Sequence, residues 1–450
     1  MIELDLVPAE EQIFGWIEKV FRQGVRRPGY PADRWAENWV QEKFHSFGLE
    51  DVRAEPVETP YWELLGSSLL VTRADGAKVD VPCFALPFSL PGEIEAPLVP
   101  LGGEDVRSSV AMSNLSLLSV PHSWYGRIAT WQFDPDDSFA GASHLLPFTQ
   151  GGQGVMEPAI DAGASGFIGV LSGYPGNSLD YYVPYDAKWR SIPGVWIRGS
   201  DGEFLNSLLA MGSVSARIEV EARREMTTSF NIVGELPGAD DEAVIIGSHH
   251  DGSWSSAVED GSGISLVLAQ AAYWSRVPPS GRPHRLKFLL NCGHMAGGAG
   301  QSAFVRTHRG ELDRVVLELH LEHAAVEVAE AGGEWHPTGR PEPRWWFTSR
   351  IPRLEAAVRE AIEAEDLRRS YILPPTAFGE KPTTDAADFY LAGVPLVNYL
   401  AAPFYLFDAM DTLNKIHRPS LVPISRAAIR IVNSTAGVSA AAMRDSTKQT

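Results

Sequence analysis

The chain has 450 residues, of which 44% are hydrophobic, with a formal net charge of -19 and an isoelectric point near 5.1. A chain of this length can bury one large core and support an accessory domain, so two domains are expected. Because so acidic a surface repels phosphates, the composition excludes nucleic acid and anionic membrane surfaces as partners.

The first residues, Met1–Leu6, contain neither a basic segment nor an apolar stretch typical of a signal peptide. No later run is long and apolar enough to cross a bilayer, which takes about 18 residues. These features predict a cytoplasmic protein. The two cysteines, Cys83 and Cys292, lie far apart without Cys-x-x-Cys spacing, which indicates neither a disulfide framework nor a thiolate zinc site.

The pattern of apolar and polar residues changes twice in the first half of the chain. Helical periodicity over residues 8–47 predicts two helices, the second ending at Gly48. Alternation over residues 52–73 then predicts strands of a sheet edge or meander. Between about residues 91 and 222, short apolar runs broken by glycine and proline predict a compact β-rich insert. Its last elements are a helix over 201–211 opened by Asp201 as N-cap and a strand over 214–220.

After Thr228 the pattern becomes strand and helix in alternation. Strands are predicted over 243–246, 285–290 and 315–321, and helices over 262–274 and 300–307. Such alternation predicts an α/β fold: a doubly wound, mixed but mostly parallel sheet with helices on both faces. Catalytic groups in such sheets lie at the carboxyl ends of the strands.

Several polar residues fall at that edge. His249 follows the strand over 243–246, and Asp251 is placed to hold its imidazole. By itself this His-x-Asp pair is a weak signal, and a structural role is the favoured interpretation of the pair alone. Glu259 and Asp260 open the next helix, where carboxylates face a positive helix end; simple capping by Asp260 is the alternative.

The strand near Leu321 carries alternating charged groups. Glu318, His320 and Glu322 share one face, where buried charges need either partners or a metal. A metal site and a buried ion-pair cluster both remain open at this point.

The segments Asn231–Gly238, Gly247–Asp251 and Glu259–Gly263 resemble the signature of the co-catalytic zinc aminopeptidase family, which includes glutamate carboxypeptidase II and the transferrin receptor. The resemblance covers nearly the whole chain. It implies that His249 is the first metal ligand and that Glu259, in place of the usual Asp, is the carboxylate that bridges two metals. It also makes a homodimer an expectation.

The β-rich insert resembles the protease-associated domain often found in that family, notably at Ala159–Ile168 and Ile192–Ile197. The expected division is therefore a metallohydrolase-like domain of residues 1–90 and 226–450, interrupted by a protease-associated-like insert of residues 91–225.

Three departures from the family pattern concern the metals. The family's adjacent Glu-Glu pair, general base followed by metal ligand, aligns with His294 and Met295, and a thioether is a poor ligand for a hard cation. The last ligand histidine aligns with Phe407. Asp385 matches an acidic family position, but Ala386 replaces the polar residue that commonly follows. Both ligands specific to one of the two metals are thus missing.

The retained residues match the ligands of the other metal. His249, Glu259 and Glu322 predict a mononuclear site for Zn, with Mn or Fe as alternatives; the competing hypothesis is that no functional metal binds. His294 then occupies the position of the general base, with Asp251 as the second catalytic residue. An imidazole pKa near 6.5 suits proton transfer at neutral pH, and a metal lowers the pKa of water towards about 7. His294 could instead only hydrogen-bond a leftover carboxylate.

Four residues are expected on the substrate side of the site: Trp254, Met295, Asp385 and Phe407. An apolar wall at Phe407 favours a small, partly aromatic or apolar substrate over a peptide chain. The roles of His250, His320 and His323, which crowd the same region, are not ranked by the sequence.

The sequence therefore predicts a metal-dependent hydrolase of a small molecule that cuts an amide or other C–N bond. Three alternatives stay open: a non-catalytic binding or scaffold protein, a metal-dependent lyase or isomerase, and a conventional metallo-aminopeptidase.

Overall fold

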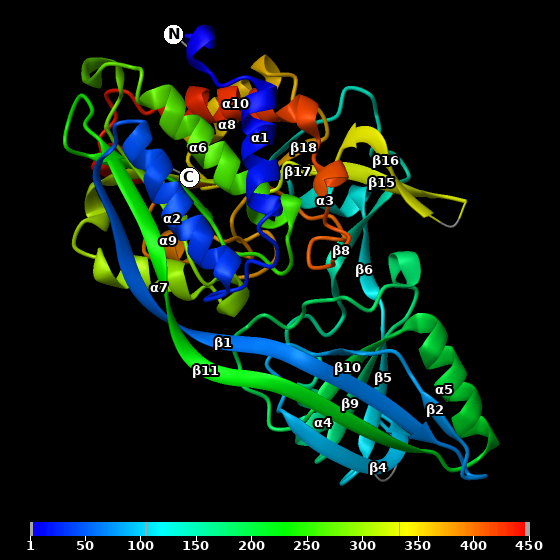
Figure 1. The fold of residues 1–450 in the computed structure, drawn as a ribbon. Coiled ribbons are helices and arrows are strands. Elements are labelled where there is room, and N and C mark those ends of the chain that lie inside the picture. Colours follow the sequence, from blue (N-terminus) through cyan, green and yellow to red (C-terminus); the bar gives the residue numbers. More distant parts are fainter. Residues whose placement is uncertain (1–2, 104–105, 333, 446–450) are drawn as a thin grey trace.

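A computed structural model describes residues 3–103, 106–332 and 334–445. It has a larger lobe that contains both ends of the chain and a smaller lobe joined to it by a long two-stranded ribbon (Figure 1). The ribbon consists of β1 (Glu50–Thr72) and β11 (Ser215–Leu236), which pair antiparallel from Glu50↔Glu235 to Thr72↔Ser215. The prediction of several strands over 52–73 is wrong, because this region is one continuous strand of 23 residues.

The centre of the larger lobe is a mixed sheet with the strand order β11-β13-β12-β14-β19-β17. Neighbours from β13 to β19 are parallel, whereas β11 and β17 pair antiparallel at either side. This confirms the predicted mixed, mostly parallel sheet. The bounds of its further strands are β12 Ala243–His249, β13 Arg285–Asn291, β14 Val315–Leu321, β17 Arg344–Thr348 and β19 Leu396–Ala401.

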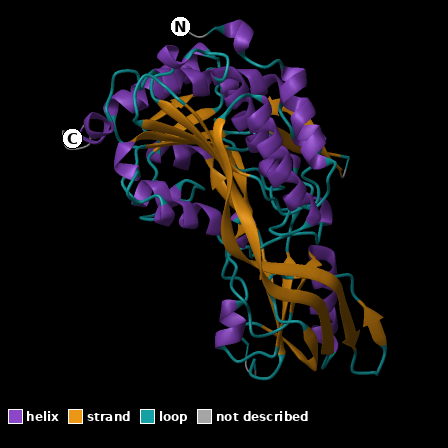
Figure 2. Ribbon diagram, turned by 60° about the vertical axis from the view of Figure 1, so that its left-hand side comes forward, coloured by secondary structure: helices purple, strands orange, loops and turns teal. Residues whose placement is uncertain are grey.

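Helices cover both faces of this sheet, as Figure 2 shows. Val244 and Ile246 of β12 pack in a core shared with residues of α1, α6 and α10, whereas Ile245 packs in a second cluster with residues of α7 and α9. Alternate strand residues therefore bury opposite faces, as the pleat requires. The helices of this lobe include α1 Glu10–Phe21, α2 Pro31–Ser46, α6 Gly263–Trp274, α7 Ala299–Thr307, α8 Pro352–Ala364, α9 Ala387–Leu391, α10 Leu421–Asn433 and α11 Ala440–Asp445, and α3 (His122–Ile128) packs against its strand β17.

The smaller lobe continues the ribbon into a second group of strands. They are β4 (Gly92–Pro100), β5 (Val110–Leu115), β9 (Gly166–Leu171) and β10 (Gly194–Arg198), flanked by α5 (Gly199–Met211). The N-cap of α5 is Arg198 and Asp201 lies in its first turn, so the predicted capping by Asp201 is wrong. The resemblance of this lobe to a protease-associated domain stays a prediction.

An antiparallel pair of strands, β6 (Leu117–Pro121) and β8 (Ser143–Thr149), runs from the smaller lobe towards the larger one (Figure 1). In the larger lobe, β12, β13 and β14 end at His249, Asn291 and Leu321. Because these strands are parallel, the residues at and after their ends meet at one edge of the sheet. Across the described ranges, every helix is too short or too polar to cross a membrane.

Candidate metal centre

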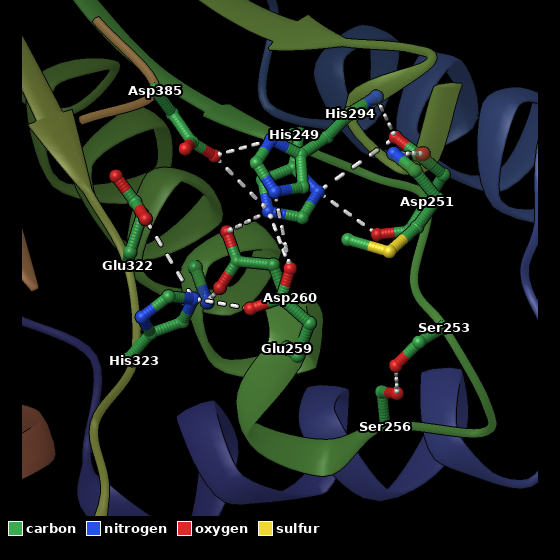
Figure 3. Close-up of polar contacts among 12 residues, drawn as sticks. His249, Asp251, Ser253, Ser256, Glu259, Asp260, His294, Glu322, His323 and Asp385 are labelled. Atoms are coloured by element: carbon green, nitrogen blue, oxygen red, sulfur yellow. Dashed lines mark hydrogen bonds and ion pairs between the residues drawn. The ribbon is translucent and has the colours of Figure 1, made fainter. Parts of the chain in front are cut away.

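Histidine and carboxylate side chains converge at the carboxyl edge of the sheet (Figure 3). His249 is the last residue of β12, whereas the sequence predicted that the strand ends at Ile246, and it is 1% exposed. Its Nδ1 lies 2.9 Å from the carbonyl oxygen of Asp251, to which it donates in the tautomer that leaves Nε2 unprotonated. Nε2 has no hydrogen-bond partner and lies 3.5 Å from Glu259 Oε1. A buried lone pair is thereby aimed at a buried carboxylate.

The Glu259 loop is held by residues far away in the chain. Main-chain amides of Val258 and Glu259 donate to the carboxylate of Asp411 at 2.9 Å each. From the other side, the buried guanidinium of Arg26 donates to the carbonyl oxygens of Ser256 and Glu259 at 3.0 and 3.3 Å. These contacts fix the position of the Glu259 side chain without using its own oxygens. No sequence signal points to Arg26, which lies 233 residues before Glu259.

His294 follows the end of β13 in a short turn that begins after Gly293, whose φ of 68° favours glycine. The carboxylate of Asp251 accepts the main-chain amides of His294 at 3.1 Å and Met295 at 2.7 Å. Asp251 therefore supports His249 through its carbonyl and holds the His294 turn with its carboxylate. The nearer carboxylate oxygen is 3.7 Å from the His249 ring, which is too long for the expected direct contact.

The imidazole of His294 stacks on that of His249, with ring centroids 4.2 Å apart. Its Nδ1 lies 2.9 Å from Asp385 Oδ2, and its Nε2 lies 3.5 Å from Glu259 Oε1. Burial lowers the pKa of His294, but the carboxylates of Asp385 and Glu259 outweigh it and raise the pKa to about 10. Without a metal this imidazole is a cation at neutral pH, which neutralises part of the surrounding negative charge.

One atom each from His249, Glu259 and His294 lies within 4.8 Å of the other two, which forms a possible metal-binding group. Glu322, the third predicted ligand, belongs to an adjacent group with His320 and Asp385. The structure thus brings His294 to the first pair of predicted ligands and places Glu322 beside them. Sequence reasoning missed this partition because it depends on side-chain direction.

The two remaining histidines of this region differ in orientation. His323 donates from Nδ1 to the carbonyl oxygen of Ala401 at 2.7 Å and places Nε2 2.6 Å from Glu259 Oε2. His250 instead faces away from the cluster, with Nδ1 2.9 Å from Asp33 and Nε2 2.9 Å from the carbonyl oxygen of Phe230. His250 therefore lies outside the cluster, in a separate buried group with Asp33 and Glu37, whereas His323 belongs to the cluster.

A cavity of about 700 Å³ opens over the cluster and is lined by His249, Glu259, His294, His320, Glu322 and His323 at its polar end. Its remaining wall is largely apolar and comes from both lobes, with Leu118, Trp124, Phe148, Trp345, Phe378 and Phe407. A cavity of this size accommodates a small organic molecule.

The four residues expected at the substrate have different places. Asp385 and Phe407 line the cavity, and the Phe407 ring packs 4.8 Å from Tyr185 between centroids. Met295 is fully buried and is not among the lining residues. Trp254 also lies outside the lining, where its Nε1 donates to the carbonyl oxygen of Phe407 at 3.1 Å. Trp254 therefore supports the wall that Phe407 forms.

The donor set fits a transition metal. His249 Nε2 and Glu259 Oε1 are buried without hydrogen-bond partners, a costly state in a folded protein unless something else binds them. Two imidazoles and one glutamate are also the ligand set of catalytic zinc in several hydrolases. Each imidazole also has a partner that orients the ring. The Asp385 carboxylate lies beside His294 Nδ1, and the Asp251 carbonyl oxygen lies beside His249 Nδ1.

Part of the chain is similar in sequence to known peptidases. The model of peptidase family M28 matches residues 231–432. Mouse carboxypeptidase Q is 24% identical over 313 residues, 65% of this chain and 58% of that protein. A probable leucine aminopeptidase 2 from Aspergillus oryzae is 28% identical over 181 residues, 39% of this chain and 35% of that protein. The chain thus spans less than two thirds of the length of either relative.

Solved structures share the fold over almost the whole chain. A peptidase M28 precursor from Shewanella amazonensis has a TM-score of 0.71 at 20% identity, over 94% of this chain and 92% of that one. BSAP, a zinc aminopeptidase from Bacillus subtilis, has a TM-score of 0.68 at 17% identity, over 96% of both chains. The alignments with these two structures therefore include both lobes of this chain.

Proposed function

We propose that the chain is a metal-dependent hydrolase that cuts an amide or related C–N bond, since the model of peptidase family M28 matches residues 231–432. The observation that carries the proposal is the convergence of His249, Glu259 and His294 donor atoms at the polar end of the cavity. A zinc ion bound by these three residues supplies a Lewis acid and lowers the pKa of a water molecule; Mn and Fe suit the same donors.

The surrounding residues prepare the site for that ion. His249 and His294 each have Nδ1 engaged, by the Asp251 carbonyl and by Asp385, so that Nε2 is left to the centre of the cluster. We assign His294 to the ligands, although the sequence predicted an acid–base catalyst at this position, because its Nε2 lies as close to Glu259 Oε1 as that of His249 does, at 3.5 Å.

The cavity indicates the class of substrate. A substrate that fits this cavity has a polar scissile group near the His249, Glu259 and His294 side chains. It also has a bulky apolar or aromatic group that packs against Trp124, Trp345 and Phe378. Phe407, where the family resemblance expects a ligand histidine, extends this apolar wall into the cluster. We therefore propose a small N-acyl or aromatic amide as substrate.

A second candidate function is conventional exopeptidase activity, which is favoured by the names of the relatives, a carboxypeptidase Q and a probable leucine aminopeptidase. A panel of anilides separates the two. Aromatic N-acyl anilides should be cleaved faster than aminoacyl anilides with a free amino group if the apolar wall selects the substrate. The reverse order would favour an aminopeptidase.

The metal-dependent step is tested with three variants. His249→Ala and Glu259→Ala should lose the bound metal and at least 100-fold of the activity on the best anilide. His122→Ala is the matched control, since His122 is a buried histidine whose Nδ1 lies 3.2 Å from the Tyr371 hydroxyl, outside the cavity lining. His294→Ala decides between the two roles of His294: loss of metal supports a ligand, whereas retained metal with lost turnover supports a proton carrier. Full activity in the His249→Ala variant would refute the proposal.

A further inference from the structure

Three neutral polar side chains line the cavity outside the proposed metal centre. Asn291 Oδ1, Gln301 Nε2 and Thr384 Oγ1 are buried and have no hydrogen-bond partner among the residues that the structure describes. Such unpaired atoms are rare in protein interiors, because each has lost its bonds to water. We propose that these residues form a subsite for a carboxamide group that the substrate carries besides the bond to be cleaved. The subsite rests on the proposed hydrolase and narrows the class of its substrates.

Gln301 supplies a fixed donor. It lies on the sheet-facing side of α7, because Phe304 and Val305, three and four residues later, pack in the second core cluster. Its side-chain amide accepts the main-chain amide of Asp388 at 2.9 Å. A main-chain N–H can only donate, so the atom that it contacts is Oε1, and the other atom is the nitrogen. Nε2 therefore carries two N–H donors that no described residue accepts, although the residue is only 7% exposed.

Asn291 reaches the same place from the sheet. It is the last residue of β13, and the carbonyl oxygen of the next residue, Cys292, accepts the amide of Gly300, which precedes Gln301, at 3.0 Å. Leu289, two residues before Asn291, packs in the cluster that α7 covers, so the Asn291 side chain leaves the sheet on the α7 side. Asn291 is 4% exposed, and its Oδ1 is an acceptor without a donor in the described part of the chain.

Thr384 approaches from the loop before α9. Its carbonyl oxygen accepts the Ala387 amide at 3.1 Å, which places it in the same turn as the Asp388 amide that Gln301 binds. Thr384 is 8% exposed, and its hydroxyl has no partner within the described ranges. Because a hydroxyl can both donate and accept, it complements either end of an amide. Two donors and one acceptor thus surround one part of the cavity wall.

A carboxamide matches this set of groups. Its oxygen accepts from Gln301 Nε2 and the Thr384 hydroxyl, and its NH₂ donates to Asn291 Oδ1. A carboxylate offers no donor to Asn291 and is repelled by Asp385, the residue after Thr384, which also lines the cavity. Lys381 of the same loop is exposed, so it contributes little to the binding of a buried anion. The competing account is an ordered water molecule that bonds the three side chains.

Two ligands of nearly equal size separate these accounts. They are 3-phenylpropanamide and 4-phenylbutan-2-one, in which a methyl group replaces the NH₂. Ligand-observed NMR titration of the full chain gives both dissociation constants, in zinc-loaded and in chelator-stripped protein. The wild type should bind the amide about 3- to 10-fold more tightly, because the ketone leaves Asn291 without a donor. The preference should be the same in both preparations, since the subsite uses no metal.

Two variants test the donors. Thr384→Val keeps the shape of the side chain, and it should weaken 3-phenylpropanamide binding about 3- to 10-fold, as should Gln301→Met. Thr384→Val should not lower the thermal midpoint of the free protein, because the hydroxyl that it removes is unpaired. Gln270→Met is the matched control: Gln270 is buried with Nε2 bonded to the Ser425 carbonyl oxygen at 2.9 Å, and it lies outside the cavity lining.

Three results would overturn the subsite and leave the metal-dependent hydrolase intact. They are equal affinities of the wild type for the two ligands, binding of neither ligand, and amide affinities that Thr384→Val and Gln301→Met leave unchanged. A lower thermal midpoint in Thr384→Val would likewise assign its hydroxyl to the fold. Failure of the wild type to cleave any anilide, with the preference for the amide retained, would refute the hydrolase alone.

Discussion

Asp411 is not a proposed metal ligand, and we expect it to affect metal affinity only by holding Glu259 in position. Its two carboxylate oxygens accept the amides of Val258 and Glu259 at 2.9 Å each. Replacement by Asn keeps the shape but turns one acceptor into a donor that faces an amide N–H. One hydrogen bond to a charged group is lost, a contribution of about 1.5–3 kcal/mol. Outer contacts of metal ligands commonly change affinity by about 10- to 100-fold, which corresponds to a similar free energy.

The assay is calorimetric titration of chelator-stripped Asp411→Asn with Zn²⁺ at pH 8. Burial raises the pKa of Asp411 to about 7, so its carboxylate is ionised in the wild type at that pH. We expect the Zn²⁺ affinity to fall about 10- to 100-fold with the far-ultraviolet circular dichroism unchanged. Asp408→Asn is the control, since Asp408 is buried in the same loop and accepts the Met410 amide at 2.8 Å. An affinity within twofold of the wild type in Asp411→Asn would refute the argument.

Three further outcomes are expected. Burial and the neighbouring Glu327 raise the pKa of Glu342 from 4.5 to about 8, so the folded chain keeps a proton that the unfolded chain releases. The free energy of unfolding, measured with urea, should therefore fall by up to about 1.4 kcal/mol per pH unit as the pH rises between these two values. The fall should be less steep in Glu342→Gln. The same pH dependence in both proteins would contradict the assignment. Phe407→Ala should lower the free energy of unfolding by about 3–5 kcal/mol, because it removes a buried ring, but should leave the metal content unchanged. Zinc at 100 times its dissociation constant should stabilise the stripped protein by about 2.7 kcal/mol, and no shift of the thermal midpoint would count against a folded-state site.

The sequence predicted the fold of the larger lobe well, for a physical reason. Residues 243–246, 285–290 and 315–321 are mainly apolar runs flanked by helical patterns, and each lies in a strand of the mixed sheet. Hydrophobic periodicity and composition are local properties, so a single sequence is enough to predict such strands and helices. The 23-residue length of β1 could not be predicted, because β1 pairs with β11 through contacts between residues more than 140 positions apart, such as Thr72 with Ser215.

The candidate site was predicted in its members but not in its arrangement. His249, Glu259 and His294 were identified from motifs, and the structure brings them together. That Glu322 groups with His320 depends on which way each side chain points at the end of β14, which spacing alone leaves open. Arg26 carries no motif at all, and its role appears only when its guanidinium reaches the carbonyl oxygens of the Glu259 loop.

The most direct test is anomalous X-ray diffraction at the zinc edge from crystals of the zinc-loaded protein. We predict a peak at about 2.0–2.2 Å from His249 Nε2, Glu259 and His294 Nε2, at the polar end of the cavity. Protein that remains free of zinc at millimolar Zn²⁺, with His294 and His323 still paired to the carboxylates of Asp385 and Glu259, would contradict the proposed metal-dependent hydrolase.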